Sequence, residues 1–148
     1  MRSVVQRVNF ATLSIDNQQH SKIGKGLLAL VGVAPDDTIK DCEYIAKKIA
    51  KMRVFEVEEK MNADVSQDGG EIMIVSQFTL YGDMRGGNRP SFIASAGGDF
   101  ANEMYEKVVE LVRGYGIDVA TGVFGADMQI NLENDGPVTI LLDSKKEF

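Results

Sequence analysis

The sequence has very few of the side chains that most often carry protein chemistry. Its 148 residues include one cysteine and one histidine. A single cysteine excludes a disulfide framework and any metal site built from cysteines. Cys42 lies among isoleucines and alanines at helical spacing, which is typical of a small buried thiol and not of a nucleophile. We therefore predict a protein without a metal site and without a cofactor.

Positive charge and long apolar runs are also scarce. The formal net charge of −6 argues against a protein that grips nucleic acid indiscriminately, so any RNA contact must rest on a few placed cations. No apolar run approaches the ~20 residues that a membrane-spanning helix needs. The N-terminal segment turns to charged residues too early for a signal peptide. These features predict a cytoplasmic protein without a membrane partner.

Three features that could suggest chemistry have simpler structural explanations. His20 lies in a polar stretch without the neighbours of a catalytic triad, so we expect a solvated turn residue. The glycines at 24 and 26 precede an apolar strand instead of linking a strand to a helix, which excludes a phosphate loop. Cations offset the exposed carbonyls at the end of a helix predicted over 39–52, and contact with RNA is the second interpretation. These cations are Lys47, Lys48, Lys51 and Arg53.

The pattern of apolar residues predicts one α/β domain over residues 1–148, with mixed β-sheet layers and two crossover helices. Residues 143–148 are polar, and we expect this tail to fray. The helices are expected over 39–52 and 99–113. Strands are expected over 2–23 as a hairpin, then over 27–33, 54–57, 71–81, 117–121, 128–133 and 138–142.

The segment 72–82 stands out because a buried strand runs directly into polar residues. Four apolar residues at 72–75 are followed by Ser76, Gln77 and Thr79, and then by a glycine-rich loop over 82–92. Buried polar groups must be satisfied by neighbours or by a ligand. The segment is therefore either a strand end whose hydroxyls bond nearby backbone or the floor of a pocket, with the loop as a carrier of function.

A second polar segment, 134–139, contains Asp-Gly-Pro and is typical of a hairpin turn. A cis bond before Pro137 would cost only about 0.5–1 kcal/mol. A hydroxyl nucleophile at Ser76 or Thr79 would need an adjacent base, and the sequence places none. Backbone amides at Gln77 and Phe78 could instead form an oxyanion hole, with the nucleophile supplied by the substrate.

Two motifs make the chain similar to a known family. Ser-Gln-Phe-Thr-Leu at 76–80 and Asn-Asp-Gly-Pro-Val-Thr at 134–139 resemble the two signature motifs of D-aminoacyl-tRNA deacylases. The resemblance covers essentially the whole chain, and two motifs in the right order make it specific. Further similar segments lie at 5–8, 26–28, 60–62, 89–92 and 124–129.

The resemblance implies a barrel-like core and a homodimer that cleaves the ester between a D-amino acid and tRNA, with the active sites at the subunit interface. Gly136 and Pro137 would form a cis turn that enters the partner's pocket and rejects L-amino acids. Glycyl-tRNA, such as glycine mischarged on tRNA(Ala), would then also be cleaved. The 2′-hydroxyl of tRNA would assist the reaction. The catalytic set would be Gln77, Phe78 and Thr79, and the substrate-binding set Ser76, Arg7, Met128, Gly136 and Pro137.

Two departures and two alternatives accompany this hypothesis. Gly86 and Val123 stand where relatives often carry cations, so contact with tRNA could be weaker or differently placed. The first alternative is a non-catalytic, dimeric RNA-binding module of the same fold. The second is an esterase with a Thr or Ser nucleophile, which the absence of a histidine partner disfavours.

Overall fold

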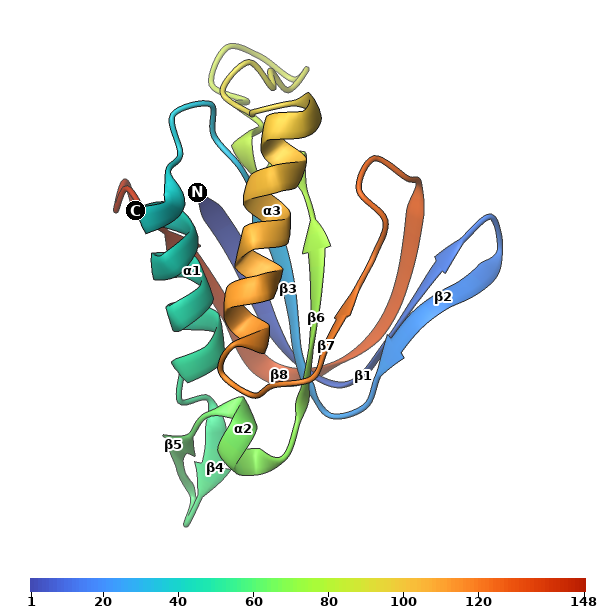
Figure 1. Ribbon diagram of the computed structural model, residues 1–148, viewed down its shortest axis with the longest axis vertical. Helices are drawn as coiled ribbons and strands as arrows, with labels where there is room; N and C mark the ends of the chain where they lie inside the picture. The colour runs from blue at the N-terminus through green and yellow to red at the C-terminus, as the bar shows by residue number, and fades with distance from the viewer.

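Two long antiparallel strands, β1 (Arg2–Ile15) and β8 (Met128–Asp143), form the spine of the sheet (Figure 1). The computed structural model describes residues 1–148 apart from Pro137. On its other edge, β1 pairs first with β3 (Gly26–Gly32) and then with β2 (Gln18–Ile23). Beyond β3 lie the parallel strands β6 (Glu71–Ser76) and β7 (Val119–Thr121). The predicted mixed sheet is confirmed, and it curves into a nearly closed, barrel-like shape.

Both predicted crossover helices are present and cover one face of the sheet (Figure 1). They are α1 (Ile39–Lys51), which follows β3, and α3 (Gly98–Arg113), which joins β6 to β7. Each buries an apolar stripe and leaves its polar face to solvent. Cys42 is fully buried in α1. Burial, with Asp37 and Asp41 nearby, raises the pKa of its thiol to about 11, so the thiol stays protonated and unreactive, as predicted.

Side chains alternate along the strands between two apolar clusters. In β6, Ile72 and Ile74 face the helices, whereas Met73 and Val75 join a second cluster on the opposite face. This alternation follows from the two-residue period of a strand. The prediction that residues 72–75 are buried on both faces is therefore confirmed. None of the helices in the described part of the chain has the length and apolar character needed to cross a membrane.

The strand predicted over 71–81 is too long. It ends at Ser76, and a 3₁₀ helix, η1 (Phe78–Tyr81), follows. The chain turns there because the Leu80 amide donates to the Gln77 carbonyl at 3.3 Å instead of continuing the ladder. The short strand predicted over 54–57 is confirmed as β4 (Phe55–Val57). Two further short elements were not predicted: β5 (Lys60–Ala63) and α2 (Val65–Asp68).

The predicted hairpin turn at 134–137 is wrong, because β8 continues past this segment along the same edge of β1. Gln6 pairs with Thr139 and Val8 pairs with Asn134, so one residue of β1 stands opposite four of β8. β8 therefore forms a large bulge at this point. Gly136 is not among the glycines with positive φ, which a tight Asp-Gly hairpin turn would require. The isomer of the bond before Pro137 lies outside the described residues.

The C-terminal tail is not frayed, because both chain ends bind the start of α1. The Met1 amino group donates to the Asp37 carboxylate at 2.6 Å and to the Ser144 hydroxyl at 2.7 Å. Ser144 in turn donates to Asp41 at 2.6 Å. The polar composition that suggested fraying thus supplies partners for a buried ammonium group and its carboxylate.

Candidate functional site

A cavity of about 600 Å³ opens where β6 ends. It is lined by residues 75–78, 95–98 and 124–128, with Phe92 and Ile130. Four residues predicted for the site meet here: Ser76, Gln77, Phe78 and Met128. The structure does not bring Thr79, Arg7 or Gly136 into this lining.

The backbone of the first motif offers hydrogen-bond donors at the edge of this cavity. The Gln77 amide donates to the Val31 carbonyl at 2.8 Å, so it is committed to the sheet and the oxyanion role expected for it does not fit this structure. The amides of Phe78 and Thr79 open η1, where no intrahelical acceptor exists. Neither donates to another group in the chain as far as the structure describes it. The Phe78 amide is therefore the better candidate of the two predicted donors.

Thr79 lacks the partner that a nucleophile needs. Its hydroxyl accepts a hydrogen bond from the Gln77 side-chain amide at 2.5 Å, and no carboxylate or imidazole within the described residues bonds to it. His20 is exposed in β2, in the arm formed with β1. Groups of three potential metal ligands are also absent from the residues described. The arrangement gives no nucleophile–base pair, in line with the sequence analysis.

Sequence reasoning missed the aromatic wall and the glycine beneath the site. Phe92 contacts Phe78 edge to face, with ring centroids 5.2 Å apart, and Phe124 closes another side. Phe92 and Phe124 lie in segments similar to the family, 89–92 and 124–129, but the sequence analysis assigned neither of them to the site. The glycine-rich loop is pinned at its base, where Asp83 and Ser91 exchange backbone hydrogen bonds. Beneath the site, a Cβ on Gly32 would lie 2.9 Å from the Gln77 carbonyl oxygen.

The start of α3 gives the cavity a favourable field for negative charge. Gly98, the first residue of this 16-residue helix, lines the cavity. Unsatisfied amides and the macrodipole place partial positive charge at a helix N-terminus. An oxyanion formed in the cavity would be stabilised by this field.

Arg7 holds the second motif in place. It is buried, with 7% of its surface exposed. Its Nε donates to the Asp135 side chain at 2.9 Å and to the Asp135 carbonyl at 3.3 Å. Its Nη1 donates to the Val54 carbonyl. The guanidinium therefore joins the bulge of β8 to the segment after α1.

Within one chain, the two motifs lie toward opposite ends of the sheet. On β3, Arg7 pairs with Leu27 and Ser76 pairs with Val31. Four residues of strand separate these positions by about 13 Å. A single chain therefore does not place Gly136 in its own cavity.

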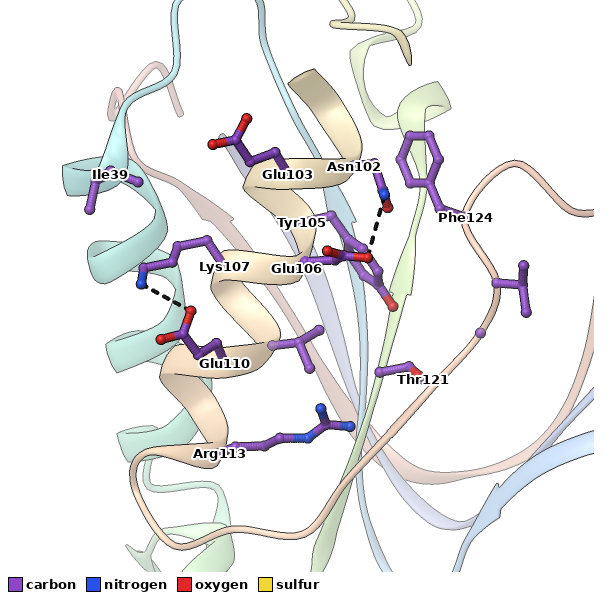
Figure 2. Close-up of a pocket in the computed structure, with 13 residues that line it drawn as sticks. Ile39, Asn102, Glu103, Tyr105, Glu106, Lys107, Glu110, Arg113, Thr121 and Phe124 are labelled. Atoms are coloured by element: carbon purple, nitrogen blue, oxygen red, sulfur yellow. Dashed lines mark hydrogen bonds and ion pairs between the residues drawn. The ribbon is translucent and has the colours of Figure 1, made fainter. Parts of the chain in front are cut away.

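A second cavity, of about 900 Å³, lies between α3 and residues 121–124 (Figure 2). Three glutamates line its wall on α3, and Lys107 and Arg113 lie among them. The cavity meets the first one only at Phe124. Its acidic wall does not favour a phosphate group. The glutamates are Glu103, Glu106 and Glu110.

Comparison with known proteins identifies the family. The family model described as D-Tyr-tRNA(Tyr) deacylase matches residues 4–143. The chain belongs to this family. Membership makes it an enzyme, a hydrolase by class. Among similar sequences, a D-aminoacyl-tRNA deacylase of Fervidobacterium nodosum is 52% identical and one of Clostridium botulinum strain Hall is 53% identical, with both chains fully covered.

Solved structures share the deacylase fold. The c-Myc DNA Unwinding Element Binding Protein superposes with a TM-score of 0.90 at 38% identity, covering 97% of this chain and 98% of that one. A probable eukaryotic D-amino acid tRNA deacylase superposes with a TM-score of 0.82 at 17% identity, covering 95% and 97%. The second likeness concerns the fold alone.

Proposed function

We propose that the chain is a cytoplasmic proofreading enzyme that hydrolyses the ester between a D-amino acid and the 3′ end of tRNA. The observation that carries this proposal is the cavity at the end of β6. It combines residues 76–78 of the family motif with free backbone donors, and the described residues give it no nucleophile–base pair. A site of this kind suits a substrate that brings its own nucleophile.

In the proposed reaction, the 2′-hydroxyl of the terminal adenosine takes part in place of a protein nucleophile. It assists a water molecule that attacks the ester carbonyl, the bond to the 3′-oxygen breaks, and that oxygen takes a proton from the water as the free amino acid leaves. The Phe78 amide donates to the developing oxyanion, assisted by the field at the start of α3. Ser76 and Met128 line the space for the aminoacyl group. Gln77 contributes through its side chain, which donates to Thr79 and fixes the geometry of η1.

The functional unit is proposed to be a homodimer with the active sites at the subunit interface. Gly136 lies away from the cavity of its own chain. In a two-fold dimer, the Gly136 end of each subunit would meet the cavity end of its partner. Carbonyl oxygens of the Gly136–Pro137 turn, with a cis bond, would then occupy the place of an L side chain. Glycine has no side chain to reject, so glycyl-tRNA is accepted.

Matched substrates test this function directly. D-tyrosyl-, L-tyrosyl- and glycyl-tRNA are incubated with the enzyme, and the remaining ester is measured over time. We expect cleavage of the D-tyrosyl and glycyl esters, with the L-tyrosyl ester spared. Resistance of glycyl-tRNA alone would refute rejection by Gly136 and Pro137. No turnover of any ester at high enzyme concentration would favour the non-catalytic nucleic-acid-binding module.

Replacing Thr79 with alanine separates the proposed mechanism from the esterase alternative. We expect kcat to fall by no more than about tenfold, or about 1.4 kcal/mol, because the hydroxyl only accepts from Gln77. Single-turnover deacylation of D-tyrosyl-tRNA measures the effect. A loss approaching the ~10⁶-fold seen when a hydroxyl nucleophile is removed would identify Thr79 as the nucleophile. Labelling by a hydroxyl-directed covalent inhibitor would do the same.

A further inference from the structure

The end of α1 carries exposed positive charge that the acidic chain does not neutralise. Lys47, Lys48 and Arg53 are exposed, and none forms an ion pair with another residue of the described chain. No Asp or Glu occurs between Glu43 and Glu56. Lys51 lies among these residues but is paired with Asp64 at 3.2 Å. We call Lys47, Lys48 and Arg53 the α1 cation cluster.

The cluster is attached to the second motif by a short chain of contacts. Arg53 immediately precedes Val54, whose carbonyl accepts from Arg7. Arg7 in turn holds the backbone and the side chain of Asp135, which precedes Gly136. Figure 1 shows the end of α1 at the end of the molecule opposite the segment that follows β6. The cluster therefore lies beside the bulge of β8 and away from the cavity of its own chain.

Helix electrostatics explain these cations only in part. Cations in a last turn are stabilising by about 0.3–1 kcal/mol each, and the effect ends with that turn. Lys48 lies in this turn and Lys47 directly before it, whereas Arg53 lies beyond the helix, which ends at Lys51. The face of α3 beside the second cavity is acidic and would repel RNA. The cluster is the better surface for phosphate groups.

We propose that the α1 cation cluster of one subunit contacts the phosphate backbone of the tRNA whose 3′ end occupies the partner's cavity. This inference rests on the proposed function and on the exchange of Gly136 between subunits. Arg7 joins the bulge of β8 to the residue that follows Arg53. If the bulge enters the partner's cavity, the cluster therefore lies at the entrance of that cavity. RNA that leads into that cavity then passes the cluster.

The first test removes the cluster with the triple variant K47A/K48A/R53A. For D-tyrosyl-tRNA at about 100 mM salt we expect KM to rise roughly tenfold with kcat unchanged. The slope of log(1/KM) against log[salt] should become shallower by about 2–3. The D-tyrosyl ester of the trinucleotide CCA lacks the tRNA stem, so the triple variant should cleave it as fast as the unmodified enzyme does. The control K40A/K107A/K146A removes the same charge elsewhere and should leave KM for tRNA unchanged.

Two outcomes of this test would overturn the inference. One is an unchanged KM for D-tyrosyl-tRNA. The other is an equal loss on tRNA and on the trinucleotide ester, which would show that the cluster supports the fold and not the RNA. Absence of turnover in the unmodified enzyme would instead refute the proposed function, so the two failures are distinguishable.

The second test uses mixed dimers to show which subunit supplies the cluster. One subunit carries the triple variant, and the other carries Phe78→Pro, which removes the proposed donor amide. Proline is tolerated in a first helical turn, and the preceding Gln77 is near the extended region. If the Phe78→Pro subunit retains turnover, the test uses a Ser76→Trp subunit instead, in which the larger side chain fills the cavity.

In the mixed dimer, the one intact cavity belongs to the subunit without the cluster and faces the intact cluster of its partner. We expect the KM of the unmodified enzyme and about half its activity, since one of two sites works. A KM that stays as high as in the triple variant would show that each cavity uses the cluster of its own chain, and the inference would be wrong.

Discussion

Replacing Gly26 with alanine is expected to prevent stable folding. An added Cβ would lie 1.8 Å from the Glu71 carbonyl oxygen and 2.8 Å from its carbonyl carbon. These atoms belong to the backbone of β6, which is paired with β3 on this side and with β7 on the other. Overpacking usually costs about 1–3 kcal/mol, but here the sheet itself must separate. We expect a loss above about 4 kcal/mol, close to the whole stability of many domains.

Gly24 provides a matched control two residues away. A Cβ on Gly24 would meet only the Glu71 side chain, at 3.6 Å, which is ordinary contact. Urea unfolding, followed by circular dichroism, should show Gly24→Ala within about 0.5 kcal/mol of the unmodified protein. If Gly26→Ala unfolded within about 1 kcal/mol of it as well, the close approach of β3 and β6 would not constrain this position.

Replacing Arg7 with methionine is expected to lower kcat/KM for D-tyrosyl-tRNA by about 100-fold, or about 2.7 kcal/mol. Methionine keeps much of the apolar stem but cannot hold Asp135 or the Val54 carbonyl. The bulge of β8 would then lose its position, and discrimination between D- and L-tyrosyl-tRNA should fall with it. Losing hydrogen bonds from a charged group should also reduce the free energy of unfolding by about 2–3 kcal/mol.

Asn9→Ala serves as the control for Arg7→Met, because it also removes a contact between β1 and β8. Its side chain donates to Glu133 at 2.7 Å on the exposed surface, and we expect little change in rate or selectivity. Both variants are assayed well below their unfolding temperatures, so that a lower rate cannot result from unfolding. Unchanged selectivity in Arg7→Met would show that Arg7 does not position the second motif for catalysis.

Local periodicity predicted the parts of the fold whose causes are local. The helices follow from apolar stripes, and the continuous apolar run at 72–75 predicted a strand buried on both faces. The bulge at 134–139 could not be predicted in this way. Its decisive partner, Arg7, lies 128 residues earlier in the sequence, whereas the Asp-Gly pair indicates a hairpin turn by itself.

The cavity shows the same limit. Ser76, Gln77 and Phe78 could be named because polar residues follow the apolar run at 72–75 and all three fall in one motif of consecutive residues. Phe92 and Phe124 come from segments that meet the strand only in three dimensions. The same holds for Gly26. The sequence excluded a phosphate loop at this position but did not show that the backbone of β6 lies against it and leaves no room for a side chain.

The position of Gly32 beneath Gln77 has a consequence for how this enzyme could lose its activity. On the proposed mechanism the donor to the oxyanion is main chain, which nearly every amino acid provides equally. Side-chain changes within the motif would then be tolerated more readily than a methyl group at Gly32, which would press on the Gln77 carbonyl oxygen 2.9 Å away. A homologue with a larger residue at position 32 would thus be inactive although its motif at 76–80 is unchanged. A homologue with substitutions in that motif would still be active if its backbone kept the same path.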